Sequence, residues 1–251
     1  RYVPGREPSS FFYSFCATSV FVPIMAFLLG IKAKPNKELK NIEGPLLIIG
    51  NHPSYLDPVV AMRLTKGTKV NFVAGEFLFR NKIWGYFFRK AGMIPKRQFV
   101  TDALAVKGMM RVMKRNGVLA IFPEATRFVD GKSITFDKGV AQMAKKSGCC
   151  IYFVKEHGAY TTYPRWRESF VRRGEIRGEF GRFVSKEEIE SMSVEEIHEM
   201  MLKELDYNEN DYMRSHPVNF FSLKMAAGLQ NVAYACPRCK KEFTMRFKGS
   251  N

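Results

Sequence analysis

A histidine and an aspartate, His52 and Asp57, lie in a short polar stretch between two apolar ones. The apolar run 45–49 precedes this stretch and a helical pattern over 59–64 follows it, so the sequence predicts a strand, a tight turn and the start of a helix. An imidazole can take a proton from a hydroxyl, and a carboxylate within reach can fix its tautomer and stabilise its cation. The pair therefore has the composition of a general base with an orienting acid.

The same residues also admit a purely structural interpretation. Asp57 followed by Pro58 is a favourable N-cap and first helical residue, and His52 would then be an ordinary turn residue. Taken alone, these residues leave the two interpretations about equal. A second group of polar residues further along the chain favours chemistry.

This second group, 122–127, follows the apolar run 118–122 just as the first polar turn follows its own run. The carboxyl ends of parallel strands meet at one edge of a sheet, so both turns are expected at the same edge. There Arg127 offers a bidentate cation for a phosphate and Thr126 offers a hydroxyl donor, while Arg97 is a candidate second cation. Taken singly, each arginine is most often a solvated surface charge.

Apolar runs and helical patterns alternate over the middle of the chain. Strand-like runs cover 45–49, 69–74, 118–122 and 149–154, a short one lies within 91–98, and helical patterns cover 59–64, 101–115 and 137–147. This alternation predicts an α/β fold with a mostly parallel central sheet flanked by helices. After it, 170–184 is expected to add one or two strands, and 185–205 is expected to be helical with two capping boxes.

The formal charge of +16 over 251 residues predicts an anionic partner: a nucleic acid, an acidic membrane surface or a phosphorylated substrate. This length is enough for one large α/β domain or for one domain with small additions, and a hydrophobic share of 46% supports a sizeable core. Five cysteines, without disulfide-like spacing, indicate a reducing compartment. Cys149 and Cys150 are expected on opposite faces of a strand, as core residues.

Residues 11–30 carry no charged side chain and are about as many as a helix needs to cross a bilayer core. Pro23 is expected to kink or split a helix, so a hairpin or a helix lying in one leaflet suits the run as well as a full span does. A buried core helix is the structural alternative. Residues 76–90 mix aromatic and basic side chains, which suits a membrane interface or a core-facing helix with a basic outer side.

Composition divides the chain into an N-terminal membrane-associated helical segment (1–40), a central domain (41–207) and a C-terminal extension (208–251). The extension holds Cys236 and Cys239 in a Cys-Pro-Arg-Cys sequence, which is similar to one knuckle of a zinc ribbon. A structural zinc needs four ligands and no second cysteine pair follows, so no metal site is expected, and these two cysteines are the remaining candidate for one.

The two polar groups together resemble the glycerolipid acyltransferase superfamily, most closely the 1-acylglycerol-3-phosphate acyltransferases, over about residues 40 to 185. The first motif of that family, Asn-His-x-x-x-x-Asp, stands at 51–57, and the third, usually Phe-Pro-Glu-Gly-Thr-Arg-Ser, stands at 122–128. Gly92 with Arg97 corresponds to the second motif, and 149–154 corresponds loosely to the fourth. The first and third motifs in this order are quite specific.

The sequence departs from the family pattern in three places. Ala125 replaces the usual glycine, so a positive φ at this position would be strained. Phe128 replaces a common serine, and 149–154 lacks the prolines of the fourth motif. These departures concern the acceptor substrate more than the acyl transfer, because His52 and Asp57 are intact.

The resemblance implies a role for each residue of the predicted site. His52 would be the general base that activates the sn-2 hydroxyl of lysophosphatidate, and Asp57 would orient its imidazole. Arg97 and Arg127 would bind the phosphate. Glu124 and Thr126 would position the glycerol or shape the loop.

The resemblance also implies the reactants and the setting. Coenzyme A or acyl-carrier protein would bring the acyl group as a thioester, with no cofactor, and the product would be phosphatidic acid. An anionic membrane surface is the expected partner, and the lysines after the apolar run (Lys32, Lys34, Lys37 and Lys40) predict a cytoplasmic active site. Glycerol-3-phosphate or another lysophospholipid is the alternative acceptor. A basic nucleic-acid-binding protein with a zinc knuckle is the alternative class, although nucleic acid is not the expected partner.

Overall fold

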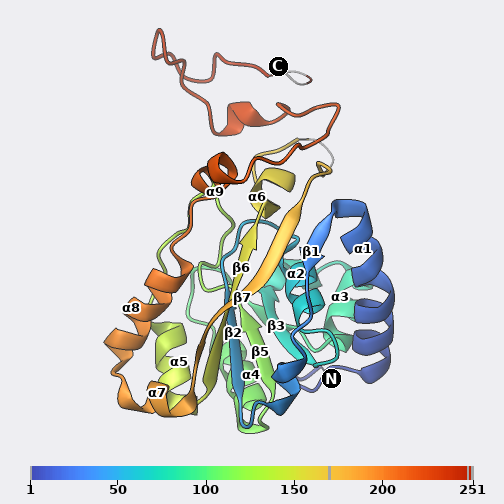
Figure 1. Cartoon of the computed structure of the whole chain (residues 1–251), viewed down its shortest axis with the longest axis vertical. Helices are drawn as coiled ribbons and strands as arrows, with labels where there is room; N and C mark the ends of the chain where they lie inside the picture. Colours follow the sequence, from blue (N-terminus) through green and yellow to red (C-terminus); the bar gives the residue numbers. More distant parts are fainter. Residues whose placement is uncertain (1, 169–170, 248, 250–251) are drawn as a thin grey trace.

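The computed structural model describes residues 2–168, 171–247 and 249, and its centre is a seven-stranded sheet (Figure 1). The strand order is β1-β7-β6-β2-β5-β3-β4, and the central strands β2, β5, β6, β3 and β4 pair in parallel. The strands are β1 (Ile31–Ala33), β2 (Leu46–Gly50), β3 (Val70–Gly75), β4 (Ile94–Lys96), β5 (Val118–Ile121), β6 (Cys150–His157) and β7 (Ile176–Val184).

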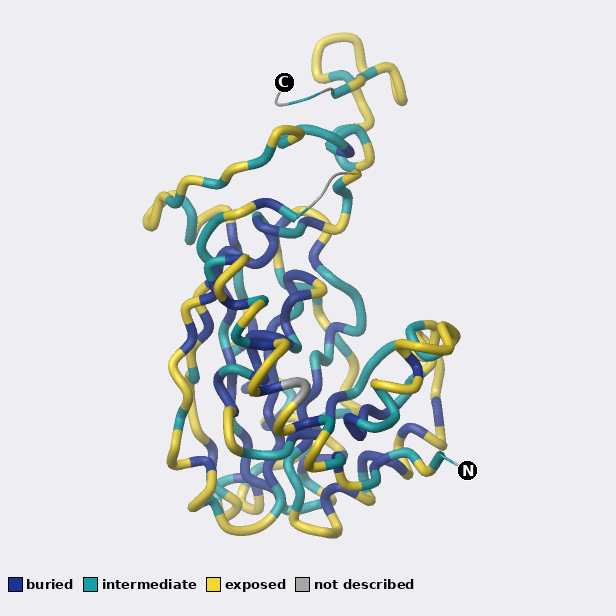
Figure 2. The backbone as a smooth tube through the Cα atoms, turned by 90° about the vertical axis from the view of Figure 1, so that its right-hand side faces the viewer, coloured by how far each residue is buried: buried dark blue, intermediate teal, exposed yellow. Residues whose placement is uncertain are grey.

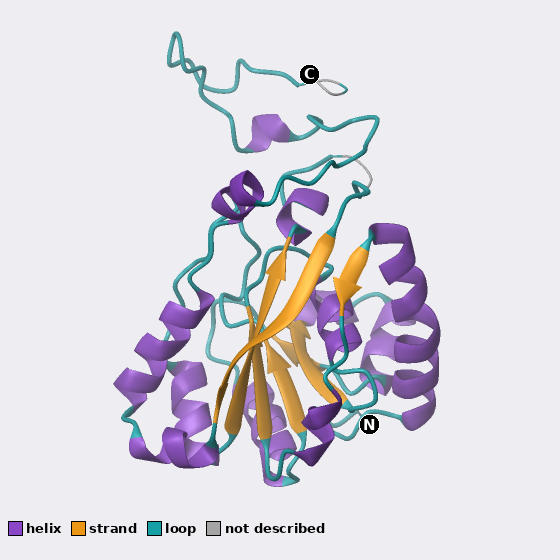
Figure 3. Cartoon of the chain, in the orientation of Figure 1, coloured by secondary structure: helices purple, strands orange, loops and turns teal. Residues whose placement is uncertain are grey.

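Helices cover both faces of this sheet (Figure 3). One face packs against α1 (Val22–Leu29), α2 (Asp57–Leu64) and α3 (Lys82–Lys90), and the other against α4 (Ala103–Lys114), α5 (Gly139–Ser147), α7 (Lys186–Ser191) and α8 (Val194–Leu205). Leu46 and Ile48 of β2 enter the first core, whereas Leu47 and Ile49 enter the second. Because both faces are covered, the strand is apolar throughout rather than alternating.

The predicted fold class is confirmed: α/β, with a mostly parallel sheet flanked by helices. β7 and β1 are the exceptions in direction: β7 runs antiparallel to β6 and returns the chain toward α7, and β1 pairs in parallel with β7. It begins at Ile176, and the start of the expected 170–184 strand region at Phe170 lies outside the described residues. Ser185 and Ser193 cap α7 and α8, and the second forms the reciprocal capping box.

The N-terminal apolar run forms one helix and not a hairpin. A π-helical part, η1 (Phe11–Phe21), continues directly into α1, and the helix changes from π to α next to Pro23, which has no N–H to donate within it. Phe11–Leu29 is the one helix in the described part of the chain that is long and apolar enough to cross a membrane, judged by length and composition only. Gly30 ends it in the left-handed conformation.

This helix has one side buried and one side exposed. Tyr13 and Val22 are buried in the first core, while Phe27 is 78% exposed. Phe12 makes edge contacts with the rings of Tyr86 and Phe87 on α3, the helix that the aromatic and basic run 76–90 forms after the short 3₁₀ turn η3 (Glu76–Phe79). The helix is therefore partly a core helix and partly an exposed apolar surface.

Both expected domain boundaries fall in packed regions of the structure. Residues 31–33 lie in the segment expected to precede the central domain, yet they form β1 and pair with β7; η2 (Lys37–Asn41) then leads to β2. At the other boundary, the buried Glu209 of α9 (Glu209–Ser215) accepts hydrogen bonds from the backbone N–H groups of Gly158 and Thr161, at the start of α6 (Ala159–Thr162). The sheet and these contacts extend the domain beyond 41–207 at both ends.

The C-terminal extension beyond α9 is mostly exposed and lies above the sheet (Figure 2). Its only helical turn in the described residues is η4 (Leu229–Asn231). Cys236 and Cys239 face one another in a turn closed by a bridge between Ala235 and Glu242. Within residues 2–168, 171–247 and 249, no group of three or more histidine, cysteine or acidic side chains is arranged to hold a metal.

Candidate active site

The two predicted polar turns meet at the carboxyl edge of the sheet. β2 ends at Gly50 and β5 at Ile121, and the two strands are paired neighbours, with Ile49 opposite Ile121. The His52 ring stacks on the Phe122 ring with 5.1 Å between centroids. The Phe128 N–H donates to the His52 carbonyl, which also connects the two turns.

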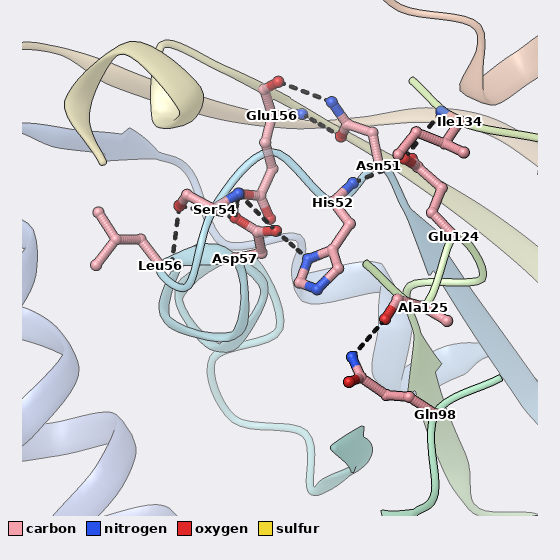
Figure 4. Close-up of polar contacts among 10 residues, drawn as sticks. All are labelled: Asn51, His52, Ser54, Leu56, Asp57, Gln98, Glu124, Ala125, Ile134 and Glu156. Carbon is pink, nitrogen blue, oxygen red and sulfur yellow. Dashed lines mark hydrogen bonds and ion pairs between the residues drawn. The ribbon is translucent and has the colours of Figure 1, made fainter. Parts of the chain in front are cut away.

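The imidazole of His52 contacts the carboxylate of Asp57. Nδ1 lies 2.6 Å from Oδ2, and the Asp57 side chain is fully buried whereas 19% of the His52 side chain is exposed (Figure 4). A carboxylate at this distance accepts a proton carried on Nδ1, which leaves the lone pair on Nε2 for chemistry. The second nitrogen has no hydrogen-bond partner in the described part of the chain.

Asp57 is held in place by its own turn. The Ser54 backbone N–H and hydroxyl both donate to Oδ1, at 3.0 Å each, and the Ser54 hydroxyl accepts from the Leu56 N–H. Leu56 is the N-cap of α2 and Asp57 is its first helical residue, so the capping interpretation of Asp57 is wrong by one position. The Asp57 side chain faces the histidine and the turn instead of closing the helix end.

A second carboxyl group, Glu156 at the end of β6, lies behind Asp57 (Figure 4). Glu156 is fully buried, and neither of its carboxyl oxygens forms a hydrogen bond with any group in the described residues. Burial first, and then the neighbouring Asp57 carboxylate, raise the pKa of Glu156 well above its ordinary value. Its backbone N–H and carbonyl pair with the Asn51 side chain at 2.9 and 3.0 Å, which connects β6 to the His52 turn.

Glu124 connects the two turns through its side chain. One oxygen accepts from the His52 N–H at 3.2 Å and the other from the Ile134 N–H at 3.1 Å. Burial raises the pKa of Glu124 to about 8, although these two donors favour the ionised form. Since both oxygens are used by the backbone, the geometry favours the loop-shaping alternative for Glu124 over contact with the glycerol.

Two of the three departures from the family pattern lie in the 122–128 motif. Ala125 has φ of 57°, the left-handed backbone that is strained for a residue other than glycine, and its carbonyl accepts from the Gln98 side chain at 2.8 Å. Phe128 is fully buried, and its ring centroid lies 6.2 Å from that of Tyr207, so its side chain packs in the interior.

Thr126 and Arg127 belong to a cluster of arginine and tyrosine side chains that the sequence did not predict. The Arg127 guanidinium lies over the Tyr55 ring, 3.4 Å from its centroid. The Thr126 hydroxyl accepts from an Arg165 guanidinium nitrogen at 2.5 Å. Arg165 comes from the segment after α6, and no motif in the sequence marks it.

Arg97 contacts a different part of the protein from Thr126 and Arg127. Its side chain is 61% exposed, and its Nε lies 3.5 Å from a carboxylate oxygen of Asp102, the N-cap of α4. The neighbouring Gln98 reaches the Ala125 carbonyl, so the loop that carries Arg97 borders the site. Five of the six predicted residues therefore lie on the two turns or directly beside them, whereas Arg97 lies at the rim of the site, paired with Asp102.

A surface hollow lies away from the predicted site. It has a volume of about 840 Å³ and is lined mainly by α9 and the segment that follows it, including Met213, Pro217 and Phe220. None of the predicted site residues lines it.

An α/β sheet that carries a histidine–aspartate pair and arginines at its carboxyl edge has the groups that a group-transfer reaction needs, since an imidazole can take a proton from a hydroxyl and guanidinium groups can hold an anion. Residues 31–154 match the family model named Acyltransferase, and this stretch of the chain belongs to the acyltransferase family.

Curated proteins similar to this chain carry one activity in their names. A chloroplastic 1-acyl-sn-glycerol-3-phosphate acyltransferase of Arabidopsis thaliana is 26% identical over 143 residues, covering 56% of this chain and 40% of that protein. A 1-acyl-sn-glycerol-3-phosphate acyltransferase of Streptococcus pneumoniae is 26% identical over 161 residues, covering 64% and 58%. The chain spans about two fifths of the length of the first curated relatives that it matches.

Among solved structures, the 1-acyl-sn-glycerophosphate (LPA) acyltransferase PlsC from Thermotoga maritima is similar in fold. The TM-score is 0.60 with 18% sequence identity, and the match covers 83% of this chain and 91% of that one. This similarity establishes the fold, including the sheet on which the two turns are placed.

Proposed function

We propose that this protein transfers a fatty acyl group from a thioester to the sn-2 hydroxyl of 1-acylglycerol-3-phosphate and so forms phosphatidic acid. The observation that carries the proposal is the 2.6 Å contact between His52 Nδ1 and Asp57, which leaves Nε2 as the base. The family match and the names of the similar curated proteins support the same activity.

The proposed reaction has two steps: the acceptor hydroxyl adds to the thioester carbonyl, and the thiolate is then eliminated. His52 Nε2 accepts the hydroxyl proton as the acceptor oxygen attacks the thioester carbonyl, and Asp57 stabilises the imidazolium. The tetrahedral intermediate then expels the thiolate, which takes the proton from the imidazolium. Because the thioester is already activated, the proposal requires no covalent acyl-enzyme and no cofactor. Coenzyme A and acyl-carrier protein are both suitable carriers.

The reaction is proposed to take place at an anionic membrane surface, with the site on the cytoplasmic side. Phe27 on α1 and Ile83 and Trp84 on α3 are exposed apolar side chains, and Arg89 and Lys90 lie in the last turn of α3. Aromatic side chains with cations nearby suit the headgroup region of a bilayer. This surface would place the site beside a lipid acceptor.

The test is an acylation assay with the purified full chain. Lysophosphatidate, glycerol-3-phosphate and lysophosphatidylcholine are each offered with acyl-coenzyme A or acyl-acyl-carrier protein, and products are identified by mass spectrometry. Phosphatidic acid is the expected main product. Formation of lysophosphatidate from glycerol-3-phosphate, with no phosphatidic acid formed from lysophosphatidate, would instead support glycerol-3-phosphate as the acceptor.

The variant His52→Ala is expected to lower kcat by about 10²–10⁴-fold, the range for loss of a general base. A turn residue contributes little packing, so its melting temperature should stay close to that of the wild type. His216→Ala removes an exposed imidazole from the end of α9 and serves as the control. A His52→Ala variant as active as this control would exclude His52 as the base.

A further inference from the structure

Three arginines and two tyrosines form a cluster beside the His52 turn. Arg127 lies over the Tyr55 ring and Arg167 lies over the Tyr163 ring, each guanidinium carbon 3.4 Å from the ring centroid. The two tyrosine rings are 6.0 Å apart, so cations and rings alternate in one group. Arg165 joins the group through its bond to Thr126, beside Arg127.

The cluster concentrates positive charge that the protein itself does not neutralise. Within residues 2–168, 171–247 and 249, none of the three arginines forms an ion pair with a carboxylate. The buried Nε of Arg167 has no hydrogen-bond partner in the same part of the chain. Burial lowers the pKa values of Arg127 and Arg167, and a neighbouring arginine lowers each further. Such an arrangement is relieved by an anion.

We propose that Arg165 and Arg167, together with Arg127, form a subsite for a phosphate monoester and select an acceptor lipid that carries one. The proposal rests on the proposed function and names the headgroup that this site takes. Guanidinium groups present paired N–H donors that match phosphate oxygens, and a dianion would meet three cations here. Arg97, paired with Asp102, has less to contribute.

The C-terminal extension stabilises the segment that carries the two new arginines. The Asn231 side chain donates to the Trp166 carbonyl at 3.1 Å, and the Glu168 N–H donates to the Ala227 carbonyl at 3.1 Å. The Glu168 carboxylate is bonded to the amides of Gln230 and Asn231, and so it faces the extension. The extension thereby has a role at the site without contributing a ligand.

The test uses three variants. The Gln double variant carries both Arg165→Gln and Arg167→Gln, the Lys double variant carries both Arg165→Lys and Arg167→Lys, and Arg173→Gln is the control. Arg173 is exposed in the same connection and has no described side-chain contact. For lysophosphatidate, the KM of the Gln double variant should rise about tenfold or more, as loss of charged hydrogen bonds requires. Its kcat, its KM for the thioester and its KM for a monoacylglycerol acceptor should stay within about twofold of wild type. The Lys double variant should recover part of the loss.

Equal KM changes for lysophosphatidate and monoacylglycerol, or no change beyond that of Arg173→Gln, would overturn the subsite. A calorimetric titration with glycerol-3-phosphate and with inorganic phosphate reads the subsite without turnover. The wild type should bind glycerol-3-phosphate more tightly than the Gln double variant, and equal binding would overturn the proposal. Binding of inorganic phosphate alone would reject a lipid headgroup as the ligand. If the wild type acylates no acceptor, the proposed function fails, whereas this titration still decides on the subsite.

Discussion

At the scale of single residues, the site depends on how three buried acids divide their tasks. Asp57 faces His52, Glu124 accepts two backbone N–H groups, and Glu156 stands behind Asp57 without a hydrogen-bond partner among the described residues. Two neighbouring carboxyl groups in a buried place do not both ionise readily. Burial and the neighbouring Asp57 raise the pKa of Glu156, so Glu156 resists ionisation beside the carboxyl group that contacts the histidine.

Glu156→Gln tests this division of charge. Burial and Asp57 hold the pKa of Glu156 well above its ordinary value, so we expect its carboxyl group to be protonated at pH 7 and the neutral glutamine to leave kcat at that pH within a few-fold of wild type. At alkaline pH, Glu156 loses its proton beside Asp57 and near Glu209, the carboxylates that face it, and wild-type activity should fall. The variant should lack that fall in a profile of kcat against pH. A large loss of kcat at pH 7 would mean that Glu156 acts as an anion.

At the scale of elements, the site is assembled from the ends of β2, β5 and β6 and from the segment after α6. Asn51 connects β2 to β6, and Glu124 connects the turns after β2 and β5. The arginine-bearing segment is held differently, by the backbone near Gly228, which has φ of 92°. A Cβ atom there would lie 2.2 Å from the Trp166 carbonyl oxygen.

Gly228→Ala should therefore separate the extension from the arginine-bearing segment. We expect a rise of several-fold in KM for lysophosphatidate together with a lower melting temperature. Gly44→Ala is a matched control, because Gly44 has φ of 83° and nothing within 4 Å of the added Cβ. It pays only the cost of a positive φ, about 1–2 kcal/mol. Equal KM values for the two variants would show that the extension does not position the arginines.

At the scale of the whole molecule, apolar side chains gather on the N-terminal helix and α3, and the site lies at one edge of the sheet. Phe11, Phe15 and Phe27 on the N-terminal helix and Ile83 and Trp84 on α3 are exposed. Exposed apolar surface of this extent on a chain of net charge +16 suits an anionic bilayer. The helix lies against the first core on its other side, so this geometry favours a helix in one leaflet.

Replacing Phe27 and Trp84 together by serine should weaken membrane binding. Burial of one large apolar side chain is worth about 1.5–3 kcal/mol, so the fraction that floats with phosphatidylcholine–phosphatidylglycerol vesicles should fall about tenfold or more. Both side chains are exposed, and thermal stability should stay near that of the wild type. Phe243→Ser, equally exposed but in the C-terminal extension, is the control. Unchanged flotation of the double variant would exclude this face as the membrane contact.

The sequence by itself determined the α/β class, the order of most strands and helices, and the two polar turns. These features are local: apolar runs mark buried strands, and Asn51 to Asp57 and Phe122 to Arg127 carry their chemistry within a few residues.

Only the tertiary structure decided which distant side chains share the site. Glu156, Arg165 and Arg167 have no recognisable pattern around them, because their roles depend on the neighbours that the sheet order and the C-terminal extension bring to them. A further long-range contact of this kind lies at the edge of the sheet. β1 pairs with β7 across more than a hundred residues, and such pairing leaves no mark in local composition.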